Sequence, residues 1–152
     1  MKEYFGGCHC GEIKFKFFSN ESIEIWKCNC SICKMHDYEH LFIKHDDFKI
    51  IEGNDLINEY SFGTKKAKHL FCKNCGIKSF YQPRSHPGSY SINLKCVEEP
   101  PEIKDIVYFD GKNEFNFSTM ASPKILFHDS WFQKLACYFF KYSTCHLKNT
   151  LA

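Results

Sequence analysis

The sequence has no long hydrophobic segment and no strong excess of charge of either sign. No apolar run approaches the roughly 18 residues that a membrane-spanning helix needs, and 20 basic against 18 acidic residues leave a formal net charge of +2. So small a charge does not by itself indicate a nucleic-acid or membrane partner. Residues 1–7 do not resemble a signal peptide. We therefore expect a cytoplasmic or nuclear protein with no membrane partner, in a compartment where thiols stay reduced.

Internal repeats and low-complexity tracts are also missing, and the composition is that of a globular protein. Hydrophobic residues make up 43% and charged residues 25% of the chain, which argues against wholesale disorder. A length of 152 residues is enough for one domain with a sizeable core and short for two. Aromatic residues at 17% favour strands over helices.

Short apolar runs separated by turn-forming residues predict a mainly β, antiparallel domain. Residues 13–17 and 90–95 alternate between apolar and polar side chains, as strands with one buried face do. Further short runs predict strands at 23–25, 41–43, 48–51, 56–62, 70–72 and 77–81. A short helix is expected at 31–38, where the sequence contains no turn signal.

The end of the chain departs from this pattern from about residue 118. Residues 131–142 form a mixed aromatic and apolar stretch of helical length, with Leu135, Phe139 and Tyr142 at i, i+4, i+7 spacing. This stretch predicts either a terminal helix that packs on the sheet or a poorly ordered tail, and the sequence does not choose between them.

Cysteine is abundant, and seven of the ten cysteines lie in three clusters. The clusters are an N-terminal pair (Cys8 and Cys10), a central triple (Cys28, Cys30 and Cys33) and a knuckle pair (Cys72 and Cys75). In a reducing compartment such clusters indicate metal ligands or catalytic thiols, and a secreted disulfide scaffold is the disfavoured alternative.

The spacing within the clusters is typical of zinc ligands. The knuckle pair, followed by Gly76, has the C-x-x-C spacing that wraps one ion, and the N-terminal pair is its strongest partner in a closed four-thiolate site. The central triple then remains as three protein ligands with a vacant fourth position, the arrangement of a catalytic zinc.

Spacing alone leaves other arrangements open. The N-terminal pair can instead combine with Cys28 and Cys30. The central triple can also be a second structural site, closed by His36, His40, His69 or Cys96. A reactive thiol cluster without metal fits the C-x-x-C spacing too.

Separated motifs in a fixed order resemble the glutathione-dependent formaldehyde-activating enzyme family, also called the centromere protein V domain family. The motifs are GGCHCG at 6–11, CNCSICK at 28–34, FCKNCG at 71–76, FYQPRS at 80–85 and NLKC at 93–96. His69 and the stretch 80–87 are most similar to the animal centromere protein V branch. The resemblance covers residues 4–117 and leaves 118–152 as a divergent C-terminal tail.

The resemblance implies an Mss4-like fold, a folded antiparallel sheet with few short helices, and two zinc ions (Zn²⁺) per chain. It implies that Cys8, Cys10, Cys72 and Cys75 hold a structural zinc and that Cys28, Cys30 and Cys33 hold a catalytic zinc. The implied activity is carbon–sulfur chemistry, the addition of glutathione to formaldehyde to give S-hydroxymethylglutathione, with a lyase label for the reverse direction.

Three thiolates on zinc leave a net charge of about −1, so the predicted centre is a weak Lewis acid suited to binding a small thiol such as glutathione. His69 and His36 are candidate proton donors by residue type only. His69 is equally a candidate for orienting a cysteine, and Arg84 for holding a substrate carboxylate.

A second hypothesis is a non-catalytic zinc module that binds a protein, microtubules or chromatin. The centromere relative carries a long basic and proline-rich segment before its domain, whereas here the domain opens at Phe5-Gly6-Gly7. We therefore expect neither a nucleic-acid nor a microtubule partner. The substrate, the direction of reaction and the oligomeric state are left open by the sequence.

Overall fold

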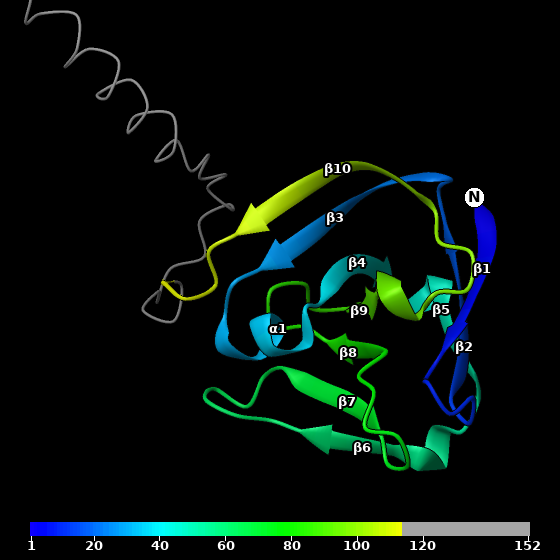
Figure 1. The fold of residues 1–152 in the computed structure, drawn as a ribbon, viewed down its shortest axis with the longest axis horizontal. Helices are drawn as coiled ribbons and strands as arrows, with labels where there is room; N and C mark the ends of the chain where they lie inside the picture. The colour runs from blue at the N-terminus through cyan, green and yellow to red at the C-terminus, as the bar shows by residue number, and fades with distance from the viewer. Residues whose placement is uncertain (114–152) are drawn as a thin grey trace, which may run out of the picture. The chain divides into compact units, whose positions relative to one another are not determined.

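Ten strands, one α-helix and three short 3-10 turns make up residues 1–113, the part of the chain that this computed structural model describes (Figure 1). The strands are β1 (Lys2–Gly7), β2 (Lys14–Ser19), β3 (Ser22–Cys28), β4 (Glu39–Lys44), β5 (Phe48–Glu52), β6 (Ile57–Tyr60), β7 (Lys68–Cys72), β8 (Phe80–Gln82), β9 (Ser89–Asn93) and β10 (Glu102–Phe109). The helix is α1 (Ser31–His36), and the 3-10 turns are η1 (His45–Asp47), η2 (Asn54–Leu56) and η3 (Leu94–Cys96). The predicted mainly β fold with few short helices is confirmed.

The smaller sheet has three antiparallel strands in the order β1-β2-β5. The β1–β2 hairpin runs in register from Lys2 opposite Ser19 to Gly7 opposite Lys14. The turn at the end of this hairpin, residues 8–13, carries the N-terminal pair of cysteines. The hairpin therefore fixes where these two side chains enter the molecule.

The larger sheet has seven strands in the order β10-β3-β4-β9-β8-β7-β6. Its neighbours are antiparallel except for β10, which pairs parallel to β3. The expected antiparallel sheet is therefore observed except at this edge, where the pairing is parallel. Parallel neighbours need a long crossover connection, and here strands β4 to β9 lie between the two in sequence.

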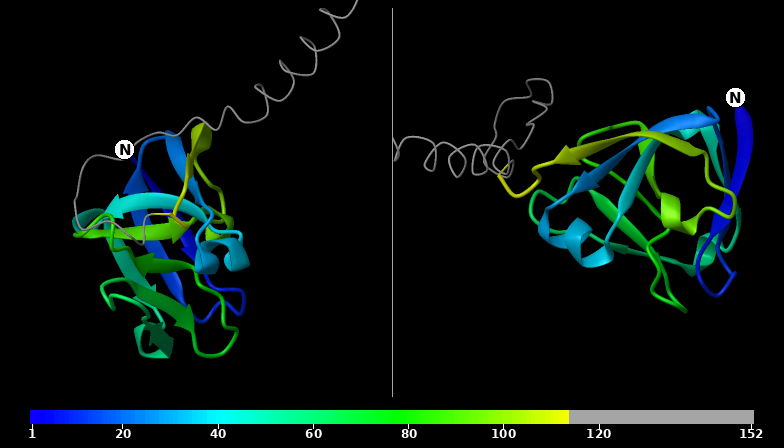
Figure 2. Two further views of the ribbon diagram at one scale, coloured as in Figure 1. Left: turned by 90° about the vertical axis from the view of Figure 1, so that its left-hand side faces the viewer. Right: turned by 45° about the horizontal axis from the view of Figure 1, so that its top comes forward.

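The ends of β3 and β10 lie side by side, and α1 follows directly after β3 (Figures 1 and 2). At this end Cys28 lies opposite Phe109 in the register of the two strands. The helix ends at His36 rather than residue 38, because Asp37 adopts a left-handed conformation with φ of 45°. The central triple thus lies where a strand gives way to a helix.

Several predicted strands differ from those observed. Strand β8 runs from Phe80 to Gln82 rather than over the expected 77–81, because the backbone before it turns back to pair Cys72 N–H with the Ile77 carbonyl. Strand β9 ends at Asn93, whose side chain accepts a hydrogen bond from Lys95 N–H and begins a 3-10 turn. Strands β1 and β10 were not predicted, and the predicted helix at 131–142 lies outside the described residues.

Phenylalanine side chains join the two sheets in the core. Phe15 on β2 is fully buried, and its ring centroid lies 5.5 Å from that of Phe48 on β5 and 5.3 Å from that of Phe80 on β8. A β-carbon on Gly6 would lie 2.6 Å from the Phe15 ring, so glycine is needed for β1 to pass this close. Contacts of Phe15 therefore reach both sheets.

Phe15→Ala should lower the free energy of unfolding by about 3–5 kcal/mol, because it leaves a cavity where the two sheets meet. Chemical denaturation followed by circular dichroism measures this change. Phe18→Ala is the matched control, since Phe18 lies on the same strand with 41% of its surface exposed. A similar loss in both variants would contradict the assignment of Phe15 to the core.

Candidate metal centres

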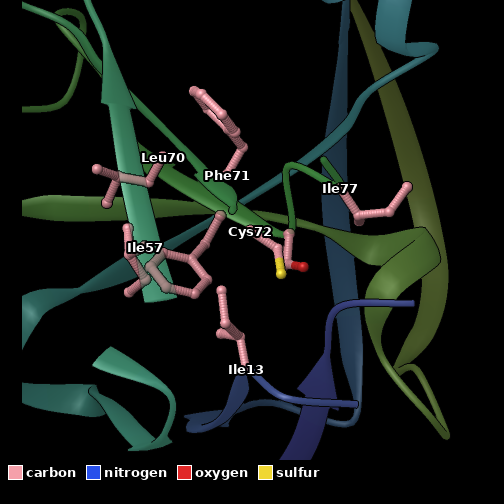
Figure 3. A pocket seen from close by; sticks show the side chains of 8 residues that line it. Ile13, Ile57, Leu70, Phe71, Cys72 and Ile77 are labelled. Carbon is pink, nitrogen blue, oxygen red and sulfur yellow. The ribbon is translucent and has the colours of Figure 1, made fainter. Parts of the chain in front are cut away.

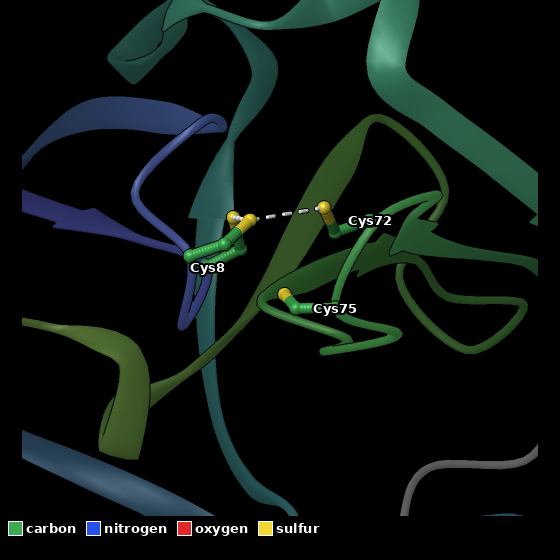
Figure 4. Close-up of side chains that lie close together, drawn as sticks. Cys8, Cys72 and Cys75 are labelled. Atoms are coloured by element: carbon green, nitrogen blue, oxygen red, sulfur yellow. Dashed lines mark hydrogen bonds between the residues drawn. The ribbon is translucent and has the colours of Figure 1, made fainter.

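Two turns from different sheets bring the N-terminal pair and the knuckle pair together. The four sulfur atoms lie within 4.8 Å of one another. Cys10 Sγ lies 3.4 Å from Cys8 Sγ and 3.6 Å from Cys72 Sγ. Figure 4 shows the Cys8, Cys72 and Cys75 side chains turned toward a common centre from the two loops.

Backbone hydrogen bonds shape both turns. Cys8 N–H donates to the Ile13 carbonyl at 3.0 Å, and Ile13 N–H donates to Cys8 Sγ at 3.3 Å. In the second turn Gly76 N–H donates to the Cys72 carbonyl at 2.9 Å, with Gly76 in the left-handed region at φ of 73°. A glycine accepts this conformation without strain, so each turn directs its sulfurs to the same point.

This four-cysteine cluster fits a zinc ion. Zinc takes four thiolates in a tetrahedron at about 2.3 Å, which sets the sulfurs about 3.8 Å apart. The observed sulfur separations of 3.4 and 3.6 Å and the all-sulfur donor set agree with that geometry. With four protein ligands the cluster is of the closed kind.

The cavity beside this cluster is too small to hold a ligand. Its volume is about 10 Å³, close to the minimum for a single water molecule. Figure 3 shows mostly apolar side chains around it, with Cys72 among them. The cavity that Cys72 lines therefore offers no space for a substrate.

The central triple forms a second group of three sulfurs within 4.8 Å of one another. Cys28 ends β3, Cys30 precedes the first turn of α1, and Cys33 lies within the helix and is buried. Cys30 N–H donates to Cys28 Sγ at 3.4 Å, and Lys34 N–H donates to the Cys30 carbonyl as the helix begins. The strand-to-helix junction thus turns all three sulfurs inward.

The three thiols of the central triple are electrostatically linked. Hydrogen bonds with Cys28 and Cys33 lower the pKa of the Cys30 thiol. The hydrogen bond with Cys30 and burial raise the pKa of Cys28, and hydrogen bonds with Cys28 and Cys30 together with burial raise that of Cys33. One thiolate is therefore stabilised by two neighbouring thiols. A cation placed among the sulfurs favours loss of the remaining protons.

No fourth ligand joins the central triple among the described residues. The histidines proposed to close it have other partners: His36 Nδ1 lies 3.0 Å from the Ile32 carbonyl, and His40 Nδ1 lies 2.9 Å from Ser91 Oγ. His69 and Cys96 also lie outside the group of ligand atoms within 4.8 Å. The alternative pairing of Cys8 and Cys10 with Cys28 and Cys30 is not the arrangement that the structure shows.

A glycine in the loop after β10 covers Cys28. A β-carbon on Gly111 would lie 2.5 Å from Cys28 Sγ and 3.0 Å from Cys30 Cβ. The loop is held there by Asn29, whose Nδ2 donates to Asp110 Oδ1 at 2.9 Å and whose Oδ1 accepts from Lys112 N–H at 3.1 Å. Only glycine fits at this position of the loop, because a side chain there would overlap the cluster.

A pocket of about 120 Å³ opens beside the central triple. Besides the three cysteines it is lined by Ile32, Phe62, Thr64, Ala67, His69, Tyr81, Arg84, Ser85, Phe109 and Gly111. His69 and Arg84, which the sequence suggested for substrate contact, thus share this pocket with the cysteines. His36 does not line it. This open space distinguishes the central triple from the four-cysteine cluster.

Strand β7 links the two clusters. His69, near its start, lines the pocket, and Cys72, at its end, belongs to the four-cysteine cluster. The His69 ring stacks on Phe62 at 5.3 Å and on Tyr81 at 5.1 Å between centroids. Burial and the nearby Lys78 charge lower the pKa of His69 to about 4, so the imidazole is neutral at neutral pH.

Lys78 is the residue beside this pocket that the sequence did not indicate. Its surface is only 3% exposed, and its Nζ lies 2.9 Å from His69 Nδ1 and 4.0 Å from the centroid of the Tyr81 ring. Burial lowers the pKa of Lys78 to about 8, while the thiolates of Cys33, Cys30 and Cys28 oppose the shift. A lone lysine within a run predicted as strand is normally solvated, so no sequence signal singled it out.

A buried polar layer lies next to Tyr81. Tyr38 OH donates to the Ser91 carbonyl at 2.7 Å, and the side chains of His40 and Ser91 are hydrogen-bonded. Burial lowers the pKa of His40 to about 3, and its Nε2 has no hydrogen-bond partner within residues 1–113. These neutral groups hold Tyr81, whose OH lies 3.5 Å from His40 Nδ1.

Gly111→Ala should displace Cys28 and weaken metal binding at the central triple, because the added methyl group overlaps Cys28 Sγ. Elemental analysis of the purified variant should show less metal per chain than the parent, with the fold retained. Lys112→Ala is the control, since that side chain is exposed in the same loop. Full metal content in Gly111→Ala would contradict the close approach of this loop.

The chain is similar to known proteins. A curated relative, an uncharacterized lyase of Schizosaccharomyces pombe, is 22% identical over 120 residues, which are 69% of this chain and 86% of the relative. The crystal structure of a Rhodobacter sphaeroides protein superposes with a TM-score of 0.57 at 31% identity and covers 62% of this chain and 87% of that one.

Within residues 1–113 no helix is long and apolar enough to cross a membrane.

The sequence profile of one family matches most of the chain. Residues 3–109 match the profile described as glutathione-dependent formaldehyde-activating enzyme, and this range contains both cysteine clusters. The match also agrees with the mainly β fold described above. This chain belongs to the glutathione-dependent formaldehyde-activating enzyme family.

Proposed function

We propose that this protein is a zinc-dependent carbon–sulfur lyase that acts on a glutathione–aldehyde adduct, S-hydroxymethylglutathione or a similar thiol substrate. The observation that carries the proposal is the contrast between the two clusters. Four sulfurs form a closed group, whereas the central triple lies at an open pocket and is joined by no fourth ligand among residues 1–113. The lyase name of the Schizosaccharomyces pombe relative supports the same class of reaction.

The metal assignment follows from the donor sets. Cys8, Cys10, Cys72 and Cys75 would hold a structural zinc ion, and Cys28, Cys30 and Cys33 a second zinc ion beside the pocket. Zinc bound by the central triple would supply a position for the substrate thiol and favour its thiolate form. The three cysteines place that position at the wall of the pocket that His69 and Tyr81 also line.

The pocket suits the reacting end of the substrate rather than the whole molecule. A volume of about 120 Å³ is below the roughly 300 Å³ at which drug-sized ligands are enclosed. The thiol and hydroxymethyl groups fit inside, and the rest of a glutathione adduct would extend across the opening. Arg84 lines the pocket and is the residue we propose for a substrate carboxylate, because a guanidinium binds carboxylates in bidentate fashion.

A non-catalytic zinc module remains the second hypothesis, and the pocket argues against it. A module that only binds a partner gains nothing from three metal ligands arranged beside a cavity, whereas an enzyme needs that space for its substrate. Closer kinship with the centromere protein V branch, suggested by His69 and the 80–87 stretch, stays a prediction.

The two zinc roles predict opposite consequences for two serine variants. Cys75→Ser should unfold or precipitate the protein, because it opens the closed cluster that ties the β1–β2 hairpin to β7. Cys33→Ser should stay folded and retain about one zinc ion per chain. Elemental analysis and circular dichroism measure both. If Cys33→Ser unfolds as badly, the central triple is structural and the enzyme proposal fails.

The role of Arg84 is tested by exchange between formaldehyde and S-hydroxymethylglutathione, followed by NMR above the spontaneous rate. Arg84→Ala should raise KM by about 10-fold or more, because a hydrogen bond to a charged group contributes about 1.5–3 kcal/mol. The KM of Arg84→Lys should lie between the values for the wild type and Arg84→Ala. A glutathione ester serves as the control substrate, and its KM should not respond. An equal response with both substrates would remove Arg84 from carboxylate binding.

A further inference from the structure

Lys78 and His69 form a buried pair at the wall of the pocket beside the central triple. Lys78 Nζ lies 2.9 Å from His69 Nδ1, and both side chains are at most 5% exposed. His69 lines the pocket that also contains the three sulfurs of the central triple. No carboxylate pairs with Lys78 within residues 1–113.

Two aromatic rings and the nearby sulfurs favour the charged form of Lys78 and oppose the effect of its burial. Its Nζ lies 4.0 Å from the Tyr81 ring centroid and 4.8 Å from that of Tyr38, so two aromatic faces contact the ammonium group. The negative charge of the central triple acts in the same direction and opposes the effect of burial. The amine therefore has hydrogens to donate, and its one hydrogen-bonding partner within residues 1–113 is His69.

We infer that Lys78 is a positioning residue that fixes the tautomer of His69. Its ammonium group donates to Nδ1, so the neutral imidazole carries its own proton on Nε2. His69 then presents a fixed N–H donor to the pocket. This inference rests on the proposed function for its chemical purpose, although the tautomer itself is a property of the protein alone.

The ring of His69 is also held in one plane. It lies between Phe62 and Tyr81, with interplanar angles of 17° and 20°. Lys78 occupies Nδ1, and Nε2 has no hydrogen-bond partner within residues 1–113. Stacking on both faces and a hydrogen bond at one edge leave the second nitrogen as the polar atom available to a ligand.

An N–H donor at this position suits the oxygen of an aldehyde or of a hydroxymethyl group. When a thiolate sulfur attacks the aldehyde carbon, the C–S bond forms and the C=O π electrons move to oxygen. The oxygen accepts a hydrogen bond from Nε2–H and takes its proton from water. In cleavage hydroxide takes the hydroxyl proton, the freed oxygen electron pair forms the C=O π bond, and the C–S bond breaks with its electron pair leaving on sulfur. His69 keeps its proton in both directions, so it is not the general acid that residue type suggested.

The tautomer is measured by long-range ¹H–¹⁵N NMR of zinc-loaded protein at neutral pH. The wild-type spectrum should show His69 protonated on Nε2, and this measurement needs no variant. Lys78→Met should shift His69 toward the Nδ1-protonated form or a mixture, whereas Lys78→Arg, which keeps a donor, should retain Nε2–H. Lys68→Met is the matched control, since that exposed lysine precedes His69 on β7.

A kinetic arm links the tautomer to turnover. Lys78→Met should lower kcat by about 10-fold or more with KM for the thiol little changed, and Lys78→Arg should restore most of the loss. His69 protonated on Nδ1 in the wild type, an unchanged tautomer in Lys78→Met, or a kcat equal to that of Lys68→Met would each overturn the inference. Absence of turnover in the wild type would overturn the proposed function, and the NMR result would still decide the role of Lys78.

Discussion

The convergence of four sulfurs from two distant turns is the constraint on which the rest of the structure depends. The N-terminal pair belongs to the hairpin of the smaller sheet, and the knuckle pair follows β7 of the larger one. A metal ion held there would close a loop of about 60 residues and cross-link the sheets, next to the core formed by Phe15, Phe48 and Phe80. Because β7 is anchored at Cys72, its other end places His69 beside the central triple.

The balance of charge explains which groups surround the central triple. Three sulfurs near one another concentrate negative charge, which is costly where the sulfurs are partly or fully buried unless cations lie close. A metal ion bound there would supply most of that compensation, and the ammonium group of Lys78 adds a positive charge against Tyr38 and Tyr81. The same ammonium meets His69, so one buried cation both balances the thiolates and orients an imidazole. In the proposed site, the charge balance and the position of the substrate would therefore depend on the same lysine.

Strand β2 was predictable from its alternation, because it has a buried and an exposed side, and β4 was predictable as a short apolar run. Strand β10 lacks this signal, since most of its residues are exposed at the edge of the sheet, and its parallel pairing to β3 depends on the whole intervening chain. The strand predicted at 77–81 starts too early, because residues 77–79 were assigned to the strand whereas the backbone there completes the turn after Cys75.

The sequence by itself determined the ligand chemistry, because C-x-C and C-x-x-C spacings bring sulfurs together through local turns and need no distant contact. Only the tertiary structure decided which cluster is closed and which lies at a pocket, since that depends on how β7, α1 and the loop after β10 pack. Gly111 over Cys28 and Lys78 against His69 are contacts between residues 83 and 9 positions apart, with no periodic pattern to announce them. The function proposed for the central triple depends on such contacts, because a thiol substrate held there would need both space and a donor.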